Sequence, residues 1–180
     1  MQKDLIIIGA GAHARVVLEA ALLQGVYNIK GFCADDLPVG SIVFENYTIL
    51  DNAMLANLNI DTSIFFIVAI GNIGAKELFF ENALKKFSPA IIIHPKSSVS
   101  ISATIGDGAI ILSNACINSA SRIGKNTIVN IGVLVDHDCI IGANVHLEVG
   151  TIVGCRTEIE NNYVSEQGQL IKPFSKVFRE

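Results

Sequence analysis

Two different spacings of hydrophobic residues divide this chain. In the first half, short apolar runs alternate with segments whose apolar residues recur at helical spacing. This pattern predicts strands that alternate with helices, which is typical of an open parallel sheet covered by helices. The predicted strands are Leu5–Ile8, Asn28–Ala34, Ile64–Ile70 and Ala90–Ile93, and the predicted helices are the segment that ends at Gly25, Asp51–Leu58 and Ala75–Phe87.

From Val99 onward the apolar residues follow a period of six. Glycine follows the aliphatic residue at Gly106, Gly124 and Gly142, which are 18 residues apart. A six-residue repeat with an 18-residue super-period describes three short strands per triangular coil, which is a parallel β-helix. The register breaks at Ser165. The aliphatic positions that we expect to point into the coil are Val99, Ile105, Ile111, Ile117, Ile123, Val129, Val135, Ile141, Leu147, Val153, Ile159, Ile171 and Val177.

The change of period predicts two domains. We expect an α/β Rossmann-like domain at residues 1–94 and a β-helix at residues 95–180. With 17 acidic and 13 basic residues the net charge is −4, which argues against nonspecific binding to nucleic acid. The four cysteines show no CxxC pairing and the four histidines lack metal-ligand spacing, so we expect reduced thiols and no metal site.

The longest apolar run, Ile64–Gly71, is far shorter than the roughly 20 residues that span a bilayer. The N-terminus shows no signal-peptide cleavage pattern. We therefore expect a cytoplasmic protein with no membrane partner.

The turn after the first predicted strand, Gly9–Ala14, has the pattern Gly-x-Gly-x-x-Ala. Such turns cradle phosphates, because glycine lets the backbone approach and the helix N-terminus offers free N–H groups. Asp35 and Asp36 follow about 20 residues later, where a carboxylate binds sugar or base groups. A dinucleotide-binding domain needs two mononucleotide-binding halves, and the first domain is long enough for only one. A nucleotide or nucleotide sugar is therefore favoured over NAD as its ligand. The glycines could instead serve packing alone.

Four segments carry a resemblance to a known family: Gly9–Val17, Ala69–Asn72, Ile93–Pro95 and Asp136–Gly142. In this order they resemble the NeuD/PglD-like family of hexapeptide-repeat acyltransferases, which acetylate sialic acids or UDP-4-amino-sugars. The resemblance implies a left-handed β-helix that takes acetyl-CoA as co-substrate, with no bound cofactor. It also implies a homotrimer with active sites between subunits and a role in bacterial surface-glycan or sialic-acid-like sugar biosynthesis.

His137 is the residue best suited to acyl transfer, because histidine accepts protons near neutral pH. It lies two positions after the inward Val135, so its side chain should point out of the coil, between Asp136 and Asp138. The resemblance makes His137 the catalytic base and Asp138 its acidic partner. The alternative is a solvated surface histidine.

The remaining site residues bind the two substrates. Eighteen residues make one coil, so position 155 should stack over His137, and the N–H groups near Gly154 and Cys155 should meet the thioester carbonyl. Cys155 could alternatively act as a nucleophile. The resemblance brings His146 to the donor, and the alternative is a structural histidine at the edge of the coil. The acceptor would bind at Gly9, Gly11, Ala12, His13, Asp35, Asp36, Gly71 and Asn72.

The chain departs from the family pattern at Ala12 and Ile73, where the family usually has glycine and asparagine, and it shows no Gly-x-Pro-Ala cap. The alternative function is a non-catalytic sugar-nucleotide-binding trimer that has lost the donor site. A third hypothesis, a nucleotide-dependent oxidoreductase, is supported by the glycine turn alone. Outward isoleucines that a trimer could cover are Ile110, Ile128, Ile140 and Ile152.

Overall fold

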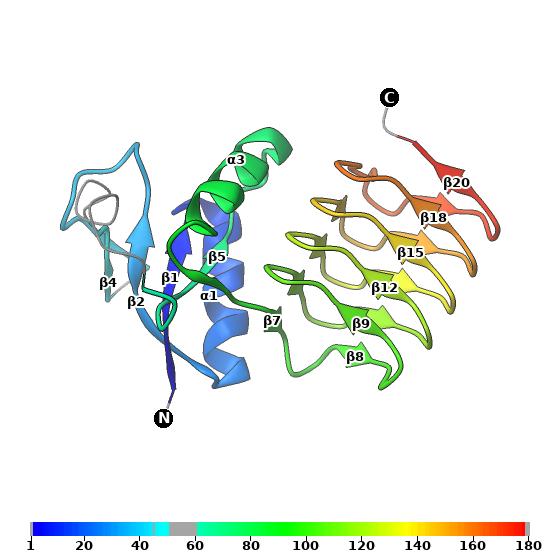
Figure 1. Ribbon diagram of the computed structural model, residues 1–180, viewed down its shortest axis with the longest axis horizontal. Helices are drawn as coiled ribbons and strands as arrows, with labels where there is room; N and C mark the ends of the chain where they lie inside the picture. The colour runs from blue at the N-terminus through cyan, green and yellow to red at the C-terminus, as the bar shows by residue number, and fades with distance from the viewer. Residues whose placement is uncertain (1, 45, 51–60, 179–180) are drawn as a thin grey trace. The chain divides into compact units, whose positions relative to one another are not determined.

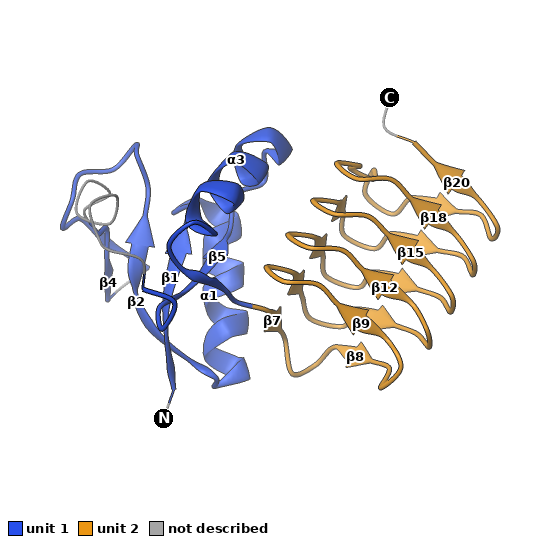
Figure 2. Ribbon diagram, viewed as in Figure 1, with its two compact units in different colours: residues 1–90 blue, residues 91–180 orange. Residues whose placement is uncertain are grey.

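The computed structural model in Figure 1 describes residues 2–44, 46–50 and 61–178. Figure 2 shows the two compact units of the chain, residues 1–90 and 91–180. The helix predicted at Asp51–Leu58 lies outside the described residues. Within the described ranges, no helix has the length and hydropathy that a membrane-spanning segment needs.

Unit 1 is built on a parallel sheet with the strand order β2-β1-β5-β6. Its helices α1 and α3 follow β1 and β5 along the chain, as the alternating pattern predicts (Figure 1). The elements of unit 1 among the described residues are β1 (Lys3–Ile8), α1 (Ala12–Gln24), β2 (Tyr27–Cys33), the antiparallel pair β3 (Ile42–Val43) and β4 (Tyr47–Thr48), β5 (Phe65–Val68), α3 (Ile73–Ala83) and β6 (Ser88–Pro89).

The register of the sheet decides which side chains share a face. Ile6 pairs with Phe66 and Ile8 with Val68, so these four side chains lie on the same face. Phe66 and Val68 form a buried cluster there with Phe80 of α3, and Ile8 packs against it. That face carries the candidate ligand cavity described below.

Unit 2 is a left-handed parallel β-helix with three faces, each a ladder of two-residue strands (Figure 1). Each strand pairs with the strand one coil further on, as Leu134 does with Ile152. The first face holds β7 (Ile92–Ile93), β10 (Ile110–Ile111), β13 (Ile128–Val129) and β16 (His146–Leu147). The second face holds β8 (Ser98–Val99), β11 (Cys116–Ile117), β14 (Leu134–Val135), β17 (Ile152–Val153) and β19 (Leu170–Ile171). The third face holds β9 (Thr104–Ile105), β12 (Arg122–Ile123), β15 (Ile140–Ile141), β18 (Glu158–Ile159) and β20 (Lys176–Val177).

The core of unit 2 is the predicted column of aliphatic residues. From Ile111 to Ile159 every residue of the six-residue series is at most 3% exposed, and Val99, Ile105 and Val177 pack against this core near its ends. The break at Ser165 also has a physical explanation. Its buried hydroxyl accepts a hydrogen bond from Glu148 N at 2.7 Å and lies 2.7 Å from Thr151 Oγ1, so a polar residue is satisfied at an inward position.

A second six-residue series, which the hydrophobic pattern did not reveal, sets the corners of the coil. One residue in each turn has a positive φ, and nine of these twelve residues are Gly, Asn or Asp, the types that adopt this conformation at least cost. Asp138 belongs to the series, with φ 59°. The positions are Gly108, Asn114, Ala120, Asn126, Gly132, Asp138, Asn144, Gly150, Arg156, Asn162, Gly168 and Phe174.

One predicted strand was wrong. Ala90–Ile93 was assigned to the sheet of the first domain, but Ser88–Pro89 takes that place beside β5. Ile92–Ile93 instead pairs with Ile110–Ile111 of the β-helix, where Ile92 N donates to Ala109 O at 3.0 Å. The coil stack therefore begins before the His94-Pro95 pair, because Ile92 N and His94 N donate to the coil ladder, whereas Ala90 N still donates to Phe66 O of the sheet at 2.8 Å.

Candidate active site

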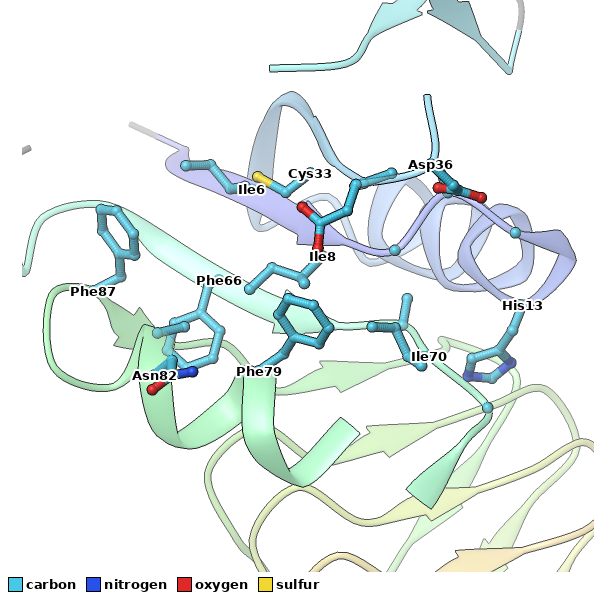
Figure 3. Close-up of a pocket in the computed structure, with 18 of the residues that line it drawn as sticks. Ile6, Ile8, His13, Cys33, Asp36, Phe66, Ile70, Phe79, Asn82 and Phe87 are labelled. Carbon is cyan, nitrogen blue, oxygen red and sulfur yellow. The ribbon is translucent and has the colours of Figure 1, made fainter. Parts of the chain in front are cut away.

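A cavity of about 820 Å³ lies in unit 1 and runs along one face of its sheet, from Asn82 and Phe87 to the glycine turn and Gly71 at the carboxyl ends of the strands (Figure 3). Open α/β sheets bind ligands at this edge. The glycine turn, Asp35, Asp36 and Gly71 all line the cavity, as the sequence predicts. Figure 3 shows apolar side chains such as Ile8, Ile70 and Phe79 along the cavity, with His13 and Asp36 at one end. An apolar wall with a few polar groups is typical of a small-molecule site.

The two glycines of the turn have different tasks. Gly9 has φ 106°, and a Cβ there would lie 2.8 Å from Ala69 O, so glycine lets the ends of β1 and β5 approach each other. A Cβ at Gly11 would meet nothing within 4 Å. Gly11 is also the N-cap of α1, which has no side-chain cap and no acidic residue in its first turn. The first N–H groups of α1 thus suit an anion such as a phosphate.

Three further residues line the cavity that sequence reasoning missed: Asn82, Lys85 and Lys86. They lie at the end of α3 and just beyond it, and Lys85 Nζ donates to Asn82 Oδ1 at 3.1 Å. The two lysines place positive charge at the end of the cavity away from the glycine turn. The only available sequence signal was a Lys-Lys pair at the end of a predicted helix, which is too common to indicate a site.

The structure restricts the side chains of two residues at or near the cavity. Burial and the neighbouring charge of Asp35 raise the pKa of the Cys33 thiol to about 12, so this cavity residue stays a neutral thiol. Asn72 does not line the cavity. Its Oδ1 accepts a hydrogen bond from Ala75 N at 2.9 Å and caps α3, so the side chain has a structural role, and an acceptor-binding role for it stays a prediction.

In unit 2, His137 lies at the corner that follows β14, and its side chain is 43% exposed. The predicted outward orientation is therefore found. His137 Nδ1–H donates to Asp138 Oδ2 at 2.7 Å. Because an ionised carboxylate only accepts, this bond leaves Nε2 with its lone pair free to take a proton. The left-handed backbone of Asp138 belongs to the turn series, so one residue shapes the corner and orients the ring.

Residues from neighbouring coils hold this corner in place. Asp136 Oδ1 accepts from His137 N at 2.8 Å and from Asn118 Nδ2 at 3.3 Å. Arg156 Nε lies 3.9 Å from Asp138 Oδ2, and Arg156 N donates to His137 O at 3.0 Å. Asp138 is thus shared between an imidazole and a guanidinium. Sequence reasoning missed Arg156, although it lies 18 residues after Asp138.

The predicted stacking of position 155 over His137 is also found. Cys155 Sγ, a ring nitrogen of His137 and a carboxylate oxygen of Asp136 all lie within 4.8 Å of one another. Of the two predicted backbone donors, however, Gly154 N–H already donates to Ile171 O at 2.9 Å in the coil ladder. No described residue accepts a hydrogen bond from Cys155 N–H, so this group is the available donor.

His146 occupies an outward position of β16, but its side chain is only 7% exposed. Its Nε2 lies 3.3 Å from Asn130 Nδ2 and 3.6 Å from Glu148 Oε1. The ring is therefore held within a polar cluster of unit 2. A role for His146 toward the donor stays a prediction.

Comparisons with known proteins find relatives of unit 1 and of the whole chain. A family model described as the PglD N-terminal domain matches residues 4–83. The acetyltransferase domain of PglB from Neisseria gonorrhoeae is 30% identical, with 98% of this chain and 89% of that chain covered and a TM-score of 0.74. The chain belongs to the PglD-like family of sugar acetyltransferases.

Two further relatives extend this picture of the family. A mutant of perosamine N-acetyltransferase from Caulobacter crescentus, in complex with CoA and GDP-perosamine, is 25% identical over 96% of this chain and 90% of that chain, with a TM-score of 0.79. UDP-N-acetylbacillosamine N-acetyltransferase of Bacillus subtilis is 29% identical over 112 residues. The match spans 62% of this chain and about half, 52%, of the Bacillus enzyme.

Proposed function

We propose that this protein transfers an acetyl group from acetyl-CoA to an amino group of a nucleotide-linked sugar. The observation that carries the proposal is the His137–Asp138 pair, an oriented base on the corner of a β-helix with the Cys155 N–H one coil away. The names of the relatives favour an amine over a hydroxyl as the acceptor. O-acetylation of a sialic-acid-like sugar is the alternative acceptor chemistry.

The reaction would proceed by direct attack. The acceptor nitrogen attacks the thioester carbonyl carbon while His137 Nε2 takes a proton from that nitrogen. The Cys155 N–H stabilises the negative oxygen of the tetrahedral intermediate. Collapse of the intermediate breaks the C–S bond, and the proton on His137 passes to the departing CoA thiolate. Asp138 stabilises the imidazolium between these two proton transfers.

The nucleotide part of the acceptor is proposed to occupy the unit 1 cavity. The first N–H groups of α1 suit its phosphates, while Asp35 and Asp36 suit hydroxyl or base N–H groups. In this proposal Gly9 and Gly71 shape the cavity and Ala12 and His13 lie at its helical edge. Acetyl-CoA would be the donor, since the acetyltransferase domain of PglB is known in complex with acetyl coenzyme A and the perosamine N-acetyltransferase in complex with CoA.

A direct test is a coupled measurement with two nucleotide sugars, UDP-4-amino-sugar and GDP-perosamine. Release of CoA from acetyl-CoA in the presence of one acceptor, with a product whose mass grows by one acetyl group, supports the proposal. Calorimetric binding of the nucleotide sugar without binding of acetyl-CoA would instead indicate the non-catalytic alternative. An acetylated form of the protein itself in intact-mass spectra would point to an acyl-cysteine at Cys155.

The Asp36→Ala variant is expected to raise the KM for the nucleotide sugar about tenfold or more, with a much smaller change in the KM for acetyl-CoA. The reason is the loss of a charge-assisted hydrogen bond from one substrate only. Steady-state kinetics with each substrate varied in turn measures the split. Glu19→Ala, an exposed acidic residue of α1, is the matched control. Equal effects of Asp36→Ala on both substrates would move the acceptor out of the cavity.

We also propose that the protein is a homotrimer whose subunits pack through the second face of the β-helix. Three outward residues in register on that face, Leu134, Ile152 and Leu170, are 41–65% exposed. The third face carries Arg122 and the Lys176–Glu158 ion pair at 2.9 Å, with Ile140 as its exposed isoleucine. The other two isoleucines that were expected to be exposed, Ile110 and Ile128, are each only 1% exposed and offer no contact surface.

Light scattering at micromolar concentration is expected to give about three times the 19.3 kDa mass of the chain. Ile152→Glu should dissociate the trimer, because it buries a charge in an apolar interface. Ile140→Glu, at a similarly exposed outward position on the third face, should leave the trimer intact. A monomeric wild-type protein, or dissociation by Ile140→Glu alone, would overturn this assignment of the interface.

A further inference from the structure

Three side chains with metal-binding atoms meet at the corner that carries the proposed base. A carboxylate oxygen of Asp136, a ring nitrogen of His137 and Sγ of Cys155 all lie within 4.8 Å of one another, and all three residues are half-buried. Two come from one coil and the third from the coil stacked on it. The ladder bonds Asp136 N to Val153 O and Arg156 N to His137 O, both at 3.0 Å, hold the two coils in this register.

The surroundings of the cluster orient two of these side chains. Asp138 Oδ2 accepts from His137 Nδ1 at 2.7 Å, so the lone pair of Nε2 is presented. A carboxylate behind a histidine is the usual support of a zinc-bound imidazole. Asp136 Oδ1 is held by His137 N at 2.8 Å and by Asn118 Nδ2 at 3.3 Å.

Although the spacing of the histidines predicts no metal site, the stacked coils bring three ligand types together, and we propose that Asp136, His137 and Cys155 bind a Zn²⁺ ion at a three-ligand site with an open fourth position. A thiolate, an imidazole and a carboxylate together suit zinc, whereas Mg²⁺ and Ca²⁺ take oxygen ligands. Zinc–ligand bonds of about 2.0–2.3 Å require the three atoms to approach to roughly 3.5 Å. Small side-chain rotations from the present spacing bring this about, because His137 is 43% exposed and the other two are half-buried. Two anionic ligands balance the charge of the ion.

The ion would use the same lone pair of His137 Nε2 that the acyl transfer needs. Zinc and catalysis therefore exclude each other at this corner, and Zn²⁺ is a reversible inhibitor of the enzyme. This consequence rests on the proposed function, but the binding of the ion does not.

The other cysteines provide a contrast. Burial raises the pKa of Cys139, and burial with the charge of Asp35 raises the pKa of Cys33 to about 12, so both disfavour the thiolate that a metal needs. Cys116 is half-buried like Cys155 but belongs to no cluster of three potential ligands within the part of the chain that the structure describes. Cys116→Ser is therefore the matched control for Cys155→Ser.

The test is a Co²⁺ titration of the metal-free full chain, since Co²⁺ replaces Zn²⁺ and reports thiolate ligation by a near-ultraviolet charge-transfer band. The wild type and Cys116→Ser should both show the band, and stoichiometric Zn²⁺ should abolish it. Cys155→Ser should lose it. Asp136→Asn should keep the band at saturation but bind Co²⁺ at least tenfold more weakly. Absence of the band from the wild type, or its persistence in Cys155→Ser, would overturn the site.

Activity gives a second measurement that separates the two proposals. Zn²⁺ should inhibit the wild type and a chelator should restore it, while Cys155→Ser should need at least tenfold more Zn²⁺ for half-inhibition of its own basal rate. Equal inhibition of the wild type and Cys155→Ser would overturn the site. Should the protein release no CoA from acetyl-CoA at all, the acyl-transfer proposal fails while the Co²⁺ band still decides the metal site.

Discussion

His137→Ala is expected to lower kcat by a factor of about 10²–10⁴ and to leave the affinity for acetyl-CoA nearly unchanged. The ring is 43% exposed and points out of the coil, so its removal costs the core little and the variant should fold. The substitution removes the proton-accepting Nε2 atom of the ring that Asp138 orients. Turnover is measured by release of CoA with the nucleotide sugar as acceptor, and donor affinity by calorimetry.

The control for this variant is His94→Ala. His94 is half-buried, and its Nδ1 accepts from Lys96 N at 3.0 Å, so it has a local structural partner and no part in the proposed reaction. Its kcat should stay within about threefold of the wild type. His137→Ala with turnover equally close to the wild type would remove the base from the mechanism.

The Asp138→Asn variant tests how much the carboxylate of Asp138 contributes to the activity of the base. Asparagine tolerates the left-handed backbone of this turn, so the fold of the corner is kept. The substitution removes the charge that stabilises the imidazolium. We therefore expect a loss of kcat that is smaller than that of His137→Ala. A loss in kcat as large as that of His137→Ala would show that Asp138 is as essential as the base.

Gly142→Ala is expected to destabilise the β-helix by about 3 kcal/mol or more, which lowers the Tm by roughly 6–12 °C. A Cβ at this position would lie 2.6 Å from Asn161 N and 2.7 Å from Glu160 C, so the added atom meets the backbone of the next coil. Side-chain rotation cannot relieve such a contact. Gly142 N also donates to Ile159 O at 2.8 Å, so moving the coils apart stretches ladder bonds. Urea denaturation followed by circular dichroism measures the loss.

Gly74→Ala is the control, because a Cβ at Gly74 makes only an ordinary contact of 3.7 Å with Asn72 Oδ1. Gly74 lies inside α3, where alanine is a better helix former, so this variant should stabilise the protein by up to about 1 kcal/mol. An unchanged urea midpoint for Gly142→Ala would mean that the glycines spaced by 18 residues do not set the distance between coils.

Much of the unit 1 cavity could be anticipated from the order of the elements. Gly9, Gly11 and Asp36 follow strands, and the carboxyl ends of parallel strands meet at one edge of a sheet. At Asn72 the order of the elements does not decide the role of the side chain. A polar residue after a strand can bind a ligand or cap the next helix, and the choice depends on the start of α3, which was predicted two residues too late.

The amino-acid sequence by itself determined the coil and its register. An inward aliphatic residue at every sixth position can be buried in only one way, so it sets three strands per coil and stacks position 155 over His137. Only the tertiary structure decided which groups at that corner are available. The ladder occupies Gly154 N–H, the left-handed turn aims Asp138 at the ring, and the next coil adds Arg156. These outcomes depend on backbone angles and on contacts between coils, which a one-dimensional pattern of apolar residues does not contain.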